Sequence, residues 1–195
     1  MMEEQENKIL NLPNKLTAVR LLCIPIVIFF MFFPGKWFSF FAAFFIGIAF
    51  ITDILDGYFA RKYSEVTVLG KFLDPLADKI LVAIVMIMLV KLGRIPVLMV
   101  LIIISREMAI TGLRAIAASE GSVIQSSKLG KFKTIFQVVA ILALALHYEY
   151  YDINMHSVGM VFLWIALVLT LWSGWNYLKQ FNELLFLESR DNRRF

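Results

Sequence analysis

The chain has 195 residues, of which 60% are hydrophobic and only 17% are charged. This balance lies well outside that of a soluble domain, so it excludes an ordinary soluble enzyme and predicts that the chain's solvent is the lipid bilayer. The net charge of +4 could fit nucleic acid, but the basic residues gather on alternate predicted connections, and no nucleic-acid partner is expected. The single cysteine, Cys23, falls in an apolar stretch and predicts a small buried hydrophobe rather than a disulfide or a cysteine metal site.

Apolar stretches that are long enough to cross a hydrocarbon core of about 30 Å as helices recur along the chain. We predict an all-α fold, namely a polytopic membrane protein with six transmembrane helices and a short N-terminal interfacial helix. The six helices are expected at residues 16–33, 37–60, 72–92, 96–118, 132–146 and 158–178. The short polar connections leave no room for a soluble domain, so residues 1–195 are expected to form a single membrane domain.

The lysine and arginine residues predict how the helices are oriented. Most of them fall on both termini and on the second-to-third and fourth-to-fifth connections, whereas Lys36, Lys91 and Arg94 fall on the opposite side. Because positively charged connections stay in the cytoplasm, both termini and the site where soluble substrates arrive are expected to face the cytoplasm.

The connections also carry proline, glycine and histidine. Residues 33–36 and 93–96 predict tight turns on the outer side. Pro75 predicts either a local bend or a helix start, because proline lacks a backbone donor and disfavours helical geometry in the preceding residue. His147 and His156 fall near the last outer connection and are expected to be interfacial polar residues rather than metal ligands.

Two of the predicted helices carry four aspartates, Asp53, Asp56, Asp74 and Asp78. A carboxylate at membrane depth costs about 2.5 to 3.5 kcal/mol, so its presence indicates a function. Spacings of three and four residues place each pair on one helix face, and two such faces meeting would create an oxygen-rich cluster. Four like charges repel one another, so we expect a divalent cation, and oxygen ligands favour Mg²⁺ or Mn²⁺.

A cation or proton path in a transporter is the main alternative interpretation of these aspartates. The residues between the acids, Gly57, Ala60, Arg61 and Gly70, argue against it. A nucleotide pyrophosphate needs close backbone approach and a guanidinium group, whereas an ion path needs neither. A non-catalytic lipid-binding membrane protein is a third possibility.

The whole segment reads D-x-x-D-G-x-x-A-R, eight further residues, then G-x-x-x-D-x-x-x-D. It is identified by these eight fixed positions as a member of the CDP-alcohol phosphotransferase family. Further motifs resemble the phosphatidylglycerophosphate synthase branch of that family. They are L-P-N-x-L-T-x-x-R at 12–20, S-R-E at 105–107, T-G-L-R at 111–114 and G-K-x-K-T-x-x-Q at 130–137.

The resemblance implies transfer of a phosphatidyl group from CDP-diacylglycerol to the primary hydroxyl of glycerol 3-phosphate, with release of CMP. It also implies a homodimer among the lipids of a bacterial cytoplasmic membrane, with two Mg²⁺ or Mn²⁺ ions bound by the four aspartates. Asp78 is implied as the general base as well. The residues expected to bind the cytidine diphosphate group are Asp53, Asp56, Gly57, Ala60, Arg61 and Gly70. Inositol phosphate, serine or phosphatidylglycerol as the acceptor are the nearest alternatives.

An acceptor such as glycerol 3-phosphate is a small dianion, so its site should supply fixed positive charge. We expect Arg114, Lys131 and Arg106 to bind its phosphate, in that order of preference. Arg106 lies in an apolar helix, and a structural ion pair is the alternative explanation. Its neighbour Glu107 projects about 100° away around the helix, whereas Arg114 is rotated by about 80° from Arg106.

The start of the fifth predicted helix carries polar residues at intervals of three, namely Lys128, Lys131, Thr134 and Gln137. They predict a polar stripe that can face the interior of the bundle. The positive-inside rule offers a rival explanation for the lysines, including Lys133, because it expects basic residues at a cytoplasmic helix end.

Overall fold

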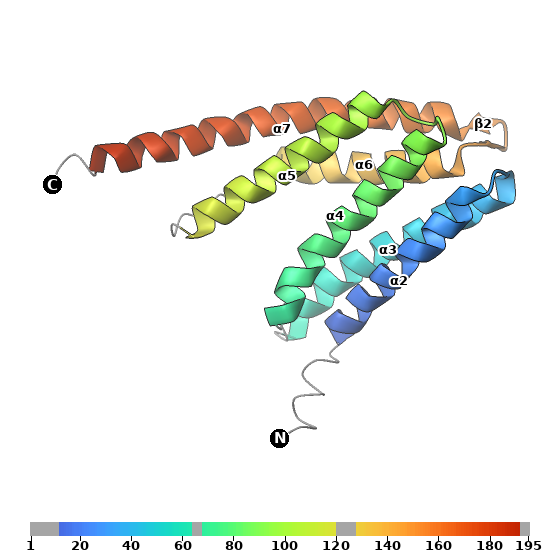
Figure 1. The fold of residues 1–195 in the computed structure, drawn as a ribbon, viewed down its shortest axis with the longest axis horizontal. Helices are drawn as coiled ribbons and strands as arrows, with labels where there is room; N and C mark the ends of the chain where they lie inside the picture. The colour runs from blue at the N-terminus through green and yellow to red at the C-terminus, as the bar shows by residue number, and fades with distance from the viewer. Residues whose placement is uncertain (1–11, 64–67, 120–127, 192–195) are drawn as a thin grey trace, which may run out of the picture. The chain divides into compact units, whose positions relative to one another are not determined.

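The computed structural model describes residues 12–63, 68–119 and 128–191. Within its helices, side chains are described except at positions 12–17, 56–63, 68–76, 78, 118–119, 128–129, 131 and 180–191. The described ranges contain six helices and one short hairpin (Figure 1): α2 (Leu12–Phe32), α3 (Lys36–Tyr63), α4 (Val68–Lys91), α5 (Val97–Ser119), α6 (Lys128–Leu146), β1 (Glu149–Tyr150), β2 (Ile153–Asn154) and α7 (Met155–Asp191). The prediction of a helical fold is confirmed.

The ends of the helices differ from the predictions in three places. Helix α2 runs from Leu12 without a break, so the segment expected to be interfacial continues into the first apolar stretch, while residues 1–11 lie outside the described part. Helix α4 begins at Val68 and contains Pro75, so a helix start at that proline is wrong. Helix α7 continues to Asp191, well past the predicted end at residue 178.

The chain divides into two compact units. The first consists of Met1–Ile95 and Ile141–Gly159, and the second of Pro96–Ala140 and Met160–Phe195. In the first unit α2 packs against both α3 and α4, the two helices that carry the aspartates (Figure 1). Its buried core is aliphatic, with residues such as Val27, Ile46 and Leu81. Nearer the surface, the ring of Phe30 on α2 stacks on those of Phe41 and Phe45 on α3 at centroid distances of 5.5 and 5.6 Å.

The predicted turns at residues 33–36 and 93–96 are confirmed, and the connection between α6 and α7 contains a hairpin that the sequence did not predict. Strands β1 and β2 pair antiparallel, with Glu149 opposite Asn154 and Tyr150 opposite Ile153. The two residues between them, Tyr151 and Asp152, both have left-handed φ angles, 51° and 62°. That geometry is typical of the tight turn whose twist matches paired strands.

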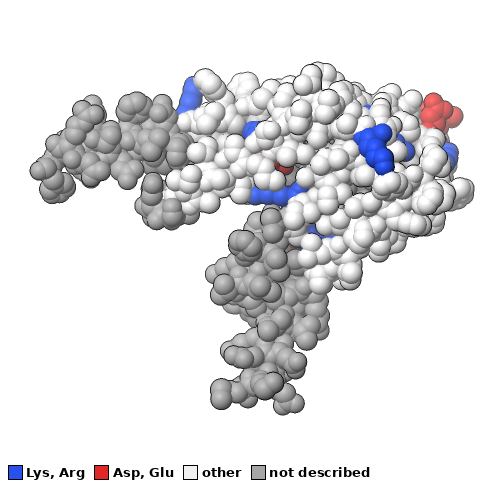
Figure 2. Space-filling view, in the orientation of Figure 1, with Lys and Arg blue, Asp and Glu red and all other residues white. Residues whose placement is uncertain are grey.

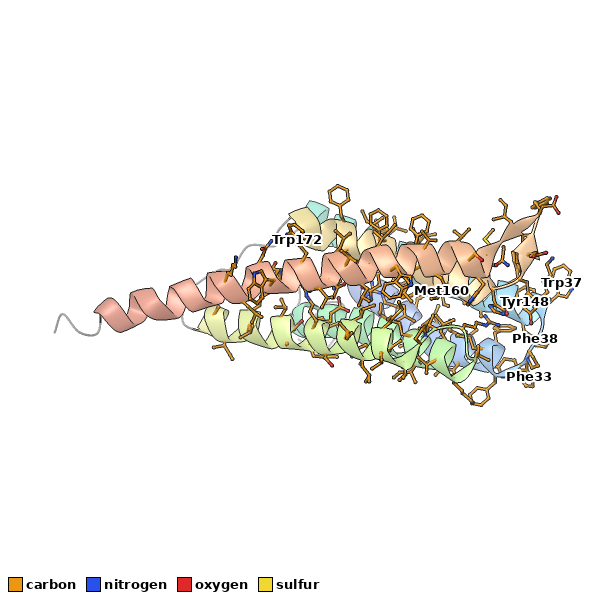
Figure 3. The ribbon with its side chains drawn as sticks, turned by 90° about the horizontal axis from the view of Figure 1, so that it is seen from above. Phe33, Trp37, Phe38, Tyr148, Met160 and Trp172 are labelled. Atoms are coloured by element: carbon orange, nitrogen blue, oxygen red, sulfur yellow. The ribbon has the colours of Figure 1, made fainter. Side chains whose placement is uncertain are left out.

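Several aromatic residues mark this end of the first unit. Figure 3 labels Phe33, Trp37, Phe38 and Tyr148 there, and the rings of Phe33 and Phe38 lie 5.3 Å apart. Lys36 connects the start of α3 to the hairpin, because its Nζ donates to the carbonyl oxygen of Glu149 at 2.7 Å. The hairpin is therefore fixed to the connection between α2 and α3.

The second unit consists of α5, most of α6 and most of α7. Phe136 of α6 stacks on Phe162 of α7 at a centroid distance of 5.7 Å. Two small polar side chains of α7, Thr170 and Ser173, are fully buried, and each donates to a backbone carbonyl of its own helix. A helix whose buried hydroxyls are satisfied internally can carry them through an apolar environment.

The exterior of both units is apolar, as expected of a membrane protein. On the face in Figure 2 most of the described surface is uncharged, and the charged side chains form isolated patches. Helix α7 exposes Trp164, Trp172 (labelled in Figure 3) and Trp175, each more than half accessible. Among the described residues, Lys36–Leu55 and Met155–Lys179 are long and apolar enough to cross a membrane, while Ala18–Phe32 and Phe132–Leu146 are shorter apolar helices. Large apolar surfaces of this kind are stable when lipid covers them.

Candidate functional site

The first aspartate of the signature, Asp53, forms an ion pair with a buried arginine. Arg20 of α2 is 0% exposed, and its Nη2 lies 2.9 Å from Oδ1 of Asp53 on α3. The Asp53 side chain is 40% exposed, so one end of the pair reaches the surface while the other is enclosed. Arg20 therefore holds the carboxylate from its buried side, while the exposed part of Asp53 stays accessible to another ligand.

The other three aspartates are placed by their helices. Asp56 lies on α3 one turn after Asp53, and Asp74 and Asp78 lie on α4. Their side chains are outside the described set, as are those of the predicted CDP-binding residues Gly57, Ala60, Arg61 and Gly70. Among the described residues, no three His, Cys, Asp or Glu side chains gather in the manner of a metal site.

The donor set nevertheless suits a hard divalent cation. The four aspartates offer oxygen ligands alone, which is the preference of Mg²⁺ and Mn²⁺. Asp53 contacts Arg20 through Oδ1 and its side chain is 40% exposed, so it can coordinate a cation without losing its ion pair. His147 directly follows the last residue of α6, and His156 lies in the first turn of α7.

The second unit holds two predicted acceptor residues against one tyrosine of α7. The guanidinium carbon of Arg114 lies 4.7 Å from the ring centroid of Tyr177, and that of Arg106 lies 5.7 Å from it. Arg114 Nη2 donates to the Tyr177 hydroxyl, and Arg106 Nη2 donates to Ser173 Oγ at 2.9 Å. Arg106 and Arg114 therefore share one side of α5.

The acid next to Arg106 pairs with a different base. Glu107 Oε1 accepts from Lys133 Nζ of α6 at 2.6 Å, and Lys133 is 2% exposed. Neither Arg106 nor Arg114 has a carboxylate partner within ion-pair distance in the part of the chain that is described. A structural ion pair, the alternative explanation for Arg106, is therefore not found there.

The predicted polar stripe on α6 is wrong at one member. Thr134 is exposed and donates to the carbonyl oxygen of Gly130 in its own helix, whereas Lys133 and Gln137 are buried. The reason is geometric, since positions four apart stay closer to one face of a helix than a series spaced by three. The Lys131 side chain, the remaining acceptor prediction, lies outside the described set, as does that of Lys128.

Three contributors to these arrangements were not predicted from the sequence. They are the pairing of Arg20 with Asp53, the pairing of Lys133 with Glu107, and the role of Tyr177. A buried basic residue inside an apolar helix was the available signal for Arg20. Tyr177 falls in an apolar stretch with several other aromatic residues, and its sequence context does not distinguish it from them.

Comparison with known proteins assigns the chain to a family. The CDP-alcohol phosphatidyltransferase family profile matches residues 10–172. A Bacillus subtilis (strain 168) protein named CDP-diacylglycerol–glycerol-3-phosphate 3-phosphatidyltransferase is 42% identical over 179 residues, covering 86% of this chain and 93% of its own length. Proteins of the same name from Rickettsia typhi and Shigella flexneri serotype 5b are 40% and 37% identical, covering 87% and 86% of this chain and 96% and 93% of their own lengths. The chain therefore belongs to the CDP-alcohol phosphatidyltransferase family.

Proposed function

We propose that this protein transfers the phosphatidyl group of CDP-diacylglycerol to the primary hydroxyl of glycerol 3-phosphate, giving phosphatidylglycerophosphate and CMP. The observation that carries the proposal is the similarity, along most of the chain, to relatives named for this reaction. The arginine pair on Tyr177 supports the choice of acceptor, because a phosphate dianion needs positive charge that is not already neutralised by carboxylates.

The donor is bound through the signature segment of α3 and α4. Asp53, Asp56, Asp74 and Asp78 hold two divalent ions, Mg²⁺ or Mn²⁺, which when bound supply charge neutralisation at the pyrophosphate. The remaining signature residues bind the cytidine diphosphate group together with Asp53 and Asp56: Gly57, Ala60, Arg61 and Gly70. Glycine and alanine allow the backbone to approach the phosphates closely, and the Arg61 guanidinium can form two parallel hydrogen bonds to them.

The reaction is a displacement at the phosphorus that carries the diacylglycerol. The acceptor hydroxyl forms a new O–P bond, the bond from this phosphorus to the CMP oxygen breaks, and CMP leaves with that electron pair. Asp78 accepts the proton of the attacking hydroxyl. Arg114, Lys131 and Arg106 bind the acceptor's own phosphate and so fix the direction from which the hydroxyl approaches.

The architecture that serves this reaction is a single membrane domain over residues 1–195 with six transmembrane helices. Both termini and the active site face the cytoplasm of a bacterial cell, and two copies form a homodimer among membrane lipids. The distribution of basic residues supports this orientation, and the apolar exterior of the helices supports the membrane environment.

One assay tests the proposal. Purified full-length protein is given CDP-diacylglycerol together with glycerol 3-phosphate, inositol phosphate, serine or phosphatidylglycerol, and CMP release is followed with and without a chelator. We expect release with glycerol 3-phosphate, its loss on chelation and its recovery on adding Mg²⁺ or Mn²⁺. If CMP is released only with one of the other compounds, that compound replaces glycerol 3-phosphate as the proposed acceptor. If no compound causes release, a transporter or a lipid-binding protein is favoured.

The Asp78→Asn variant tests the general base in the same assay. The amide keeps the size of the side chain but accepts a proton poorly, so CMP release should fall sharply while the protein stays folded. A wild-type rate from the folded variant would remove Asp78 from that role.

A further inference from the structure

We propose that Tyr177 is a positioning residue that holds Arg106 and Arg114 as a fixed pair for the phosphate of the acceptor. Ser173 and Gly174, which lie one turn earlier on α7, help to hold Arg106. Tyr177 thereby favours phosphorylated acceptors over neutral and zwitterionic ones. This inference rests on the proposed function, because the acceptor role of the two arginines belongs to that proposal. It adds the residues that position the guanidinium groups of those arginines.

The first support is the contact of one ring with two like charges. Two guanidinium groups repel each other unless something holds them, and the face of an aromatic ring attracts both. Tyr177 is 4% exposed, and its ring centroid lies 5.7 Å from the guanidinium carbon of Arg106 and 4.7 Å from that of Arg114. The tyrosine hydroxyl adds a hydrogen bond that fixes the orientation of Arg114 about its long axis.

The second support is the way in which α7 holds Arg106. Ser173 Oγ donates to the carbonyl oxygen of Leu169 at 2.7 Å and accepts from Arg106 Nη2 at 2.9 Å, so the hydroxyl is committed on both sides. A Cβ at Gly174 would lie 3.3 Å from both Cγ and Nε of Arg106. The absence of a side chain at Gly174 therefore leaves the space along which Arg106 extends.

The third support is what remains available on the two arginines. Each guanidinium has five N–H donors, and the described contacts of each use one nitrogen, Nη2. Arg106 Nε is buried and has no hydrogen-bond partner among the described residues. Glu107, the nearest acid in sequence, is bonded to Lys133. The pair therefore keeps its positive charge and donors for an anion, and a phosphate dianion with three oxygens is the ligand that matches them.

The experiment compares Tyr177→Phe and Tyr177→Leu with the wild type. Phe keeps the ring and loses the hydroxyl, whereas Leu loses both. Tyr151→Phe is the matched control, because Tyr151 lies in the hairpin turn and is 99% exposed. For each purified protein we would measure KM for glycerol 3-phosphate, KM for CDP-diacylglycerol, kcat, and the rise in melting temperature caused by glycerol 3-phosphate alone.

We expect KM for glycerol 3-phosphate to rise about fivefold in Tyr177→Phe and about twentyfold in Tyr177→Leu, because each step releases arginine rotamers that binding must then order. KM for CDP-diacylglycerol should stay within about twofold, since only the acceptor arginines are released. Glycerol 3-phosphate should raise the melting temperature of Tyr177→Leu less than that of the wild type.

Different outcomes reject the inference and the proposed function. A wild type that releases no CMP with glycerol 3-phosphate rejects the proposed function. If the wild type is active but Tyr177→Phe and Tyr177→Leu match Tyr151→Phe in KM for glycerol 3-phosphate, the inference alone is rejected. An equal rise in both KM values would also reject it, because that is the sign of a general structural role.

Discussion

Arg94 and the pair formed by Arg106 and Arg114 show two ways of holding a guanidinium in an apolar protein. Arg94 is 7% exposed and uses both terminal nitrogens on uncharged acceptors of its own unit. Its Nη1 donates to the carbonyl oxygens of Leu144 and Ala145 at 3.2 and 2.7 Å, and its Nη2 donates to Ser39 Oγ at 2.8 Å. Arg106 and Arg114 instead lie over a ring and give one hydrogen bond each to a hydroxyl.

The difference separates a structural arginine from one available to a ligand. Arg94 satisfies carbonyls at the C-terminal end of α6, where helix carbonyls lack partners in their own helix and attract positive charge. Burial lowers the pKa of Arg94, although the nearby tyrosines oppose that shift. An aromatic face, by contrast, orients a guanidinium without consuming its donors. We therefore expect substitutions at Arg94 to change stability and those around Tyr177 to change acceptor binding.

The largest expected effect is that of Arg114→Ala on acceptor binding. Truncating one partner of a charged, hydrogen-bonded contact costs about 2 to 5 kcal/mol, so KM for glycerol 3-phosphate should rise about a hundredfold. KM for CDP-diacylglycerol and the melting temperature should change little. Arg114→Lys keeps the charge and loses the planar group, so its KM for glycerol 3-phosphate should lie between those of the wild type and of Arg114→Ala. A similar rise in both KM values would remove Arg114 from the acceptor site.

Arg94→Met tests the opposite side of the comparison. It leaves two carbonyls and one hydroxyl without their donor, and each unsatisfied buried group costs about 1 kcal/mol or more, so we expect a loss of about 3 kcal/mol of stability. In a chain of this size the melting temperature should fall by about 10 °C. At temperatures below thermal unfolding, kcat and both KM values should match those of the wild type. A selective change in KM for glycerol 3-phosphate would break the comparison.

Gly174→Ala should have a smaller effect. The added methyl group would lie 3.3 Å from Arg106, which must shift by a few tenths of an ångström, so we expect KM for glycerol 3-phosphate to rise about threefold. Gly112→Ala on α5 is the matched control, because its Cβ would meet nothing within 4 Å. Both changes favour the helix, so melting temperatures should not fall. Equal KM values in the two variants would show that Gly174 does not shape the pair.

The smallest effect is expected from a change in pH, and it involves His147, which the charge of Arg94 influences. Burial, then the charges of Arg94 and His156, lowers the pKa of His147 below its usual 6.5. As the pH falls through about 6.5, His147 becomes protonated in the unfolded chain but stays neutral in the folded chain. Its contribution to the free energy of unfolding is therefore fully present above this pH and declines below it. His147→Asn should flatten that decline in melting temperature. Asparagine suits the left-handed backbone there, with φ of 62°. An unchanged slope would assign the decline to another group.

The sequence predicted the helices better than their ends. Long apolar stretches specify helices because a bilayer offers no partner to an unpaired backbone group, and both predicted proline–glycine turns are found. The end of α7 and the start of α4 could not be predicted in this way, because both helices continue into segments less apolar than their middles. The hairpin was missed since a pair of two-residue strands is too short to show alternation.

The candidate site was predictable where its residues follow one another closely along the sequence. The signature of eight fixed positions identified the family, and the family profile confirms that identification. Pairings between helices could not be predicted, because Arg20 with Asp53, Lys133 with Glu107, and Arg114 with Tyr177 join residues far apart in sequence. The individual roles of the four aspartates stay predictions.

The ion pair of Arg20 and Asp53 also bears on how the chain is made. Synthesis delivers Arg20 to the membrane before Asp53, and a buried arginine without its counter-charge is strongly unfavourable in an apolar environment. The connection between α2 and α3 is only a few residues long, so the two helices can enter together with the charges already paired. With the metal-binding role proposed above, Asp53 would then act twice in the life of the protein, first as the counter-charge of Arg20 while α2 inserts and later as a metal ligand.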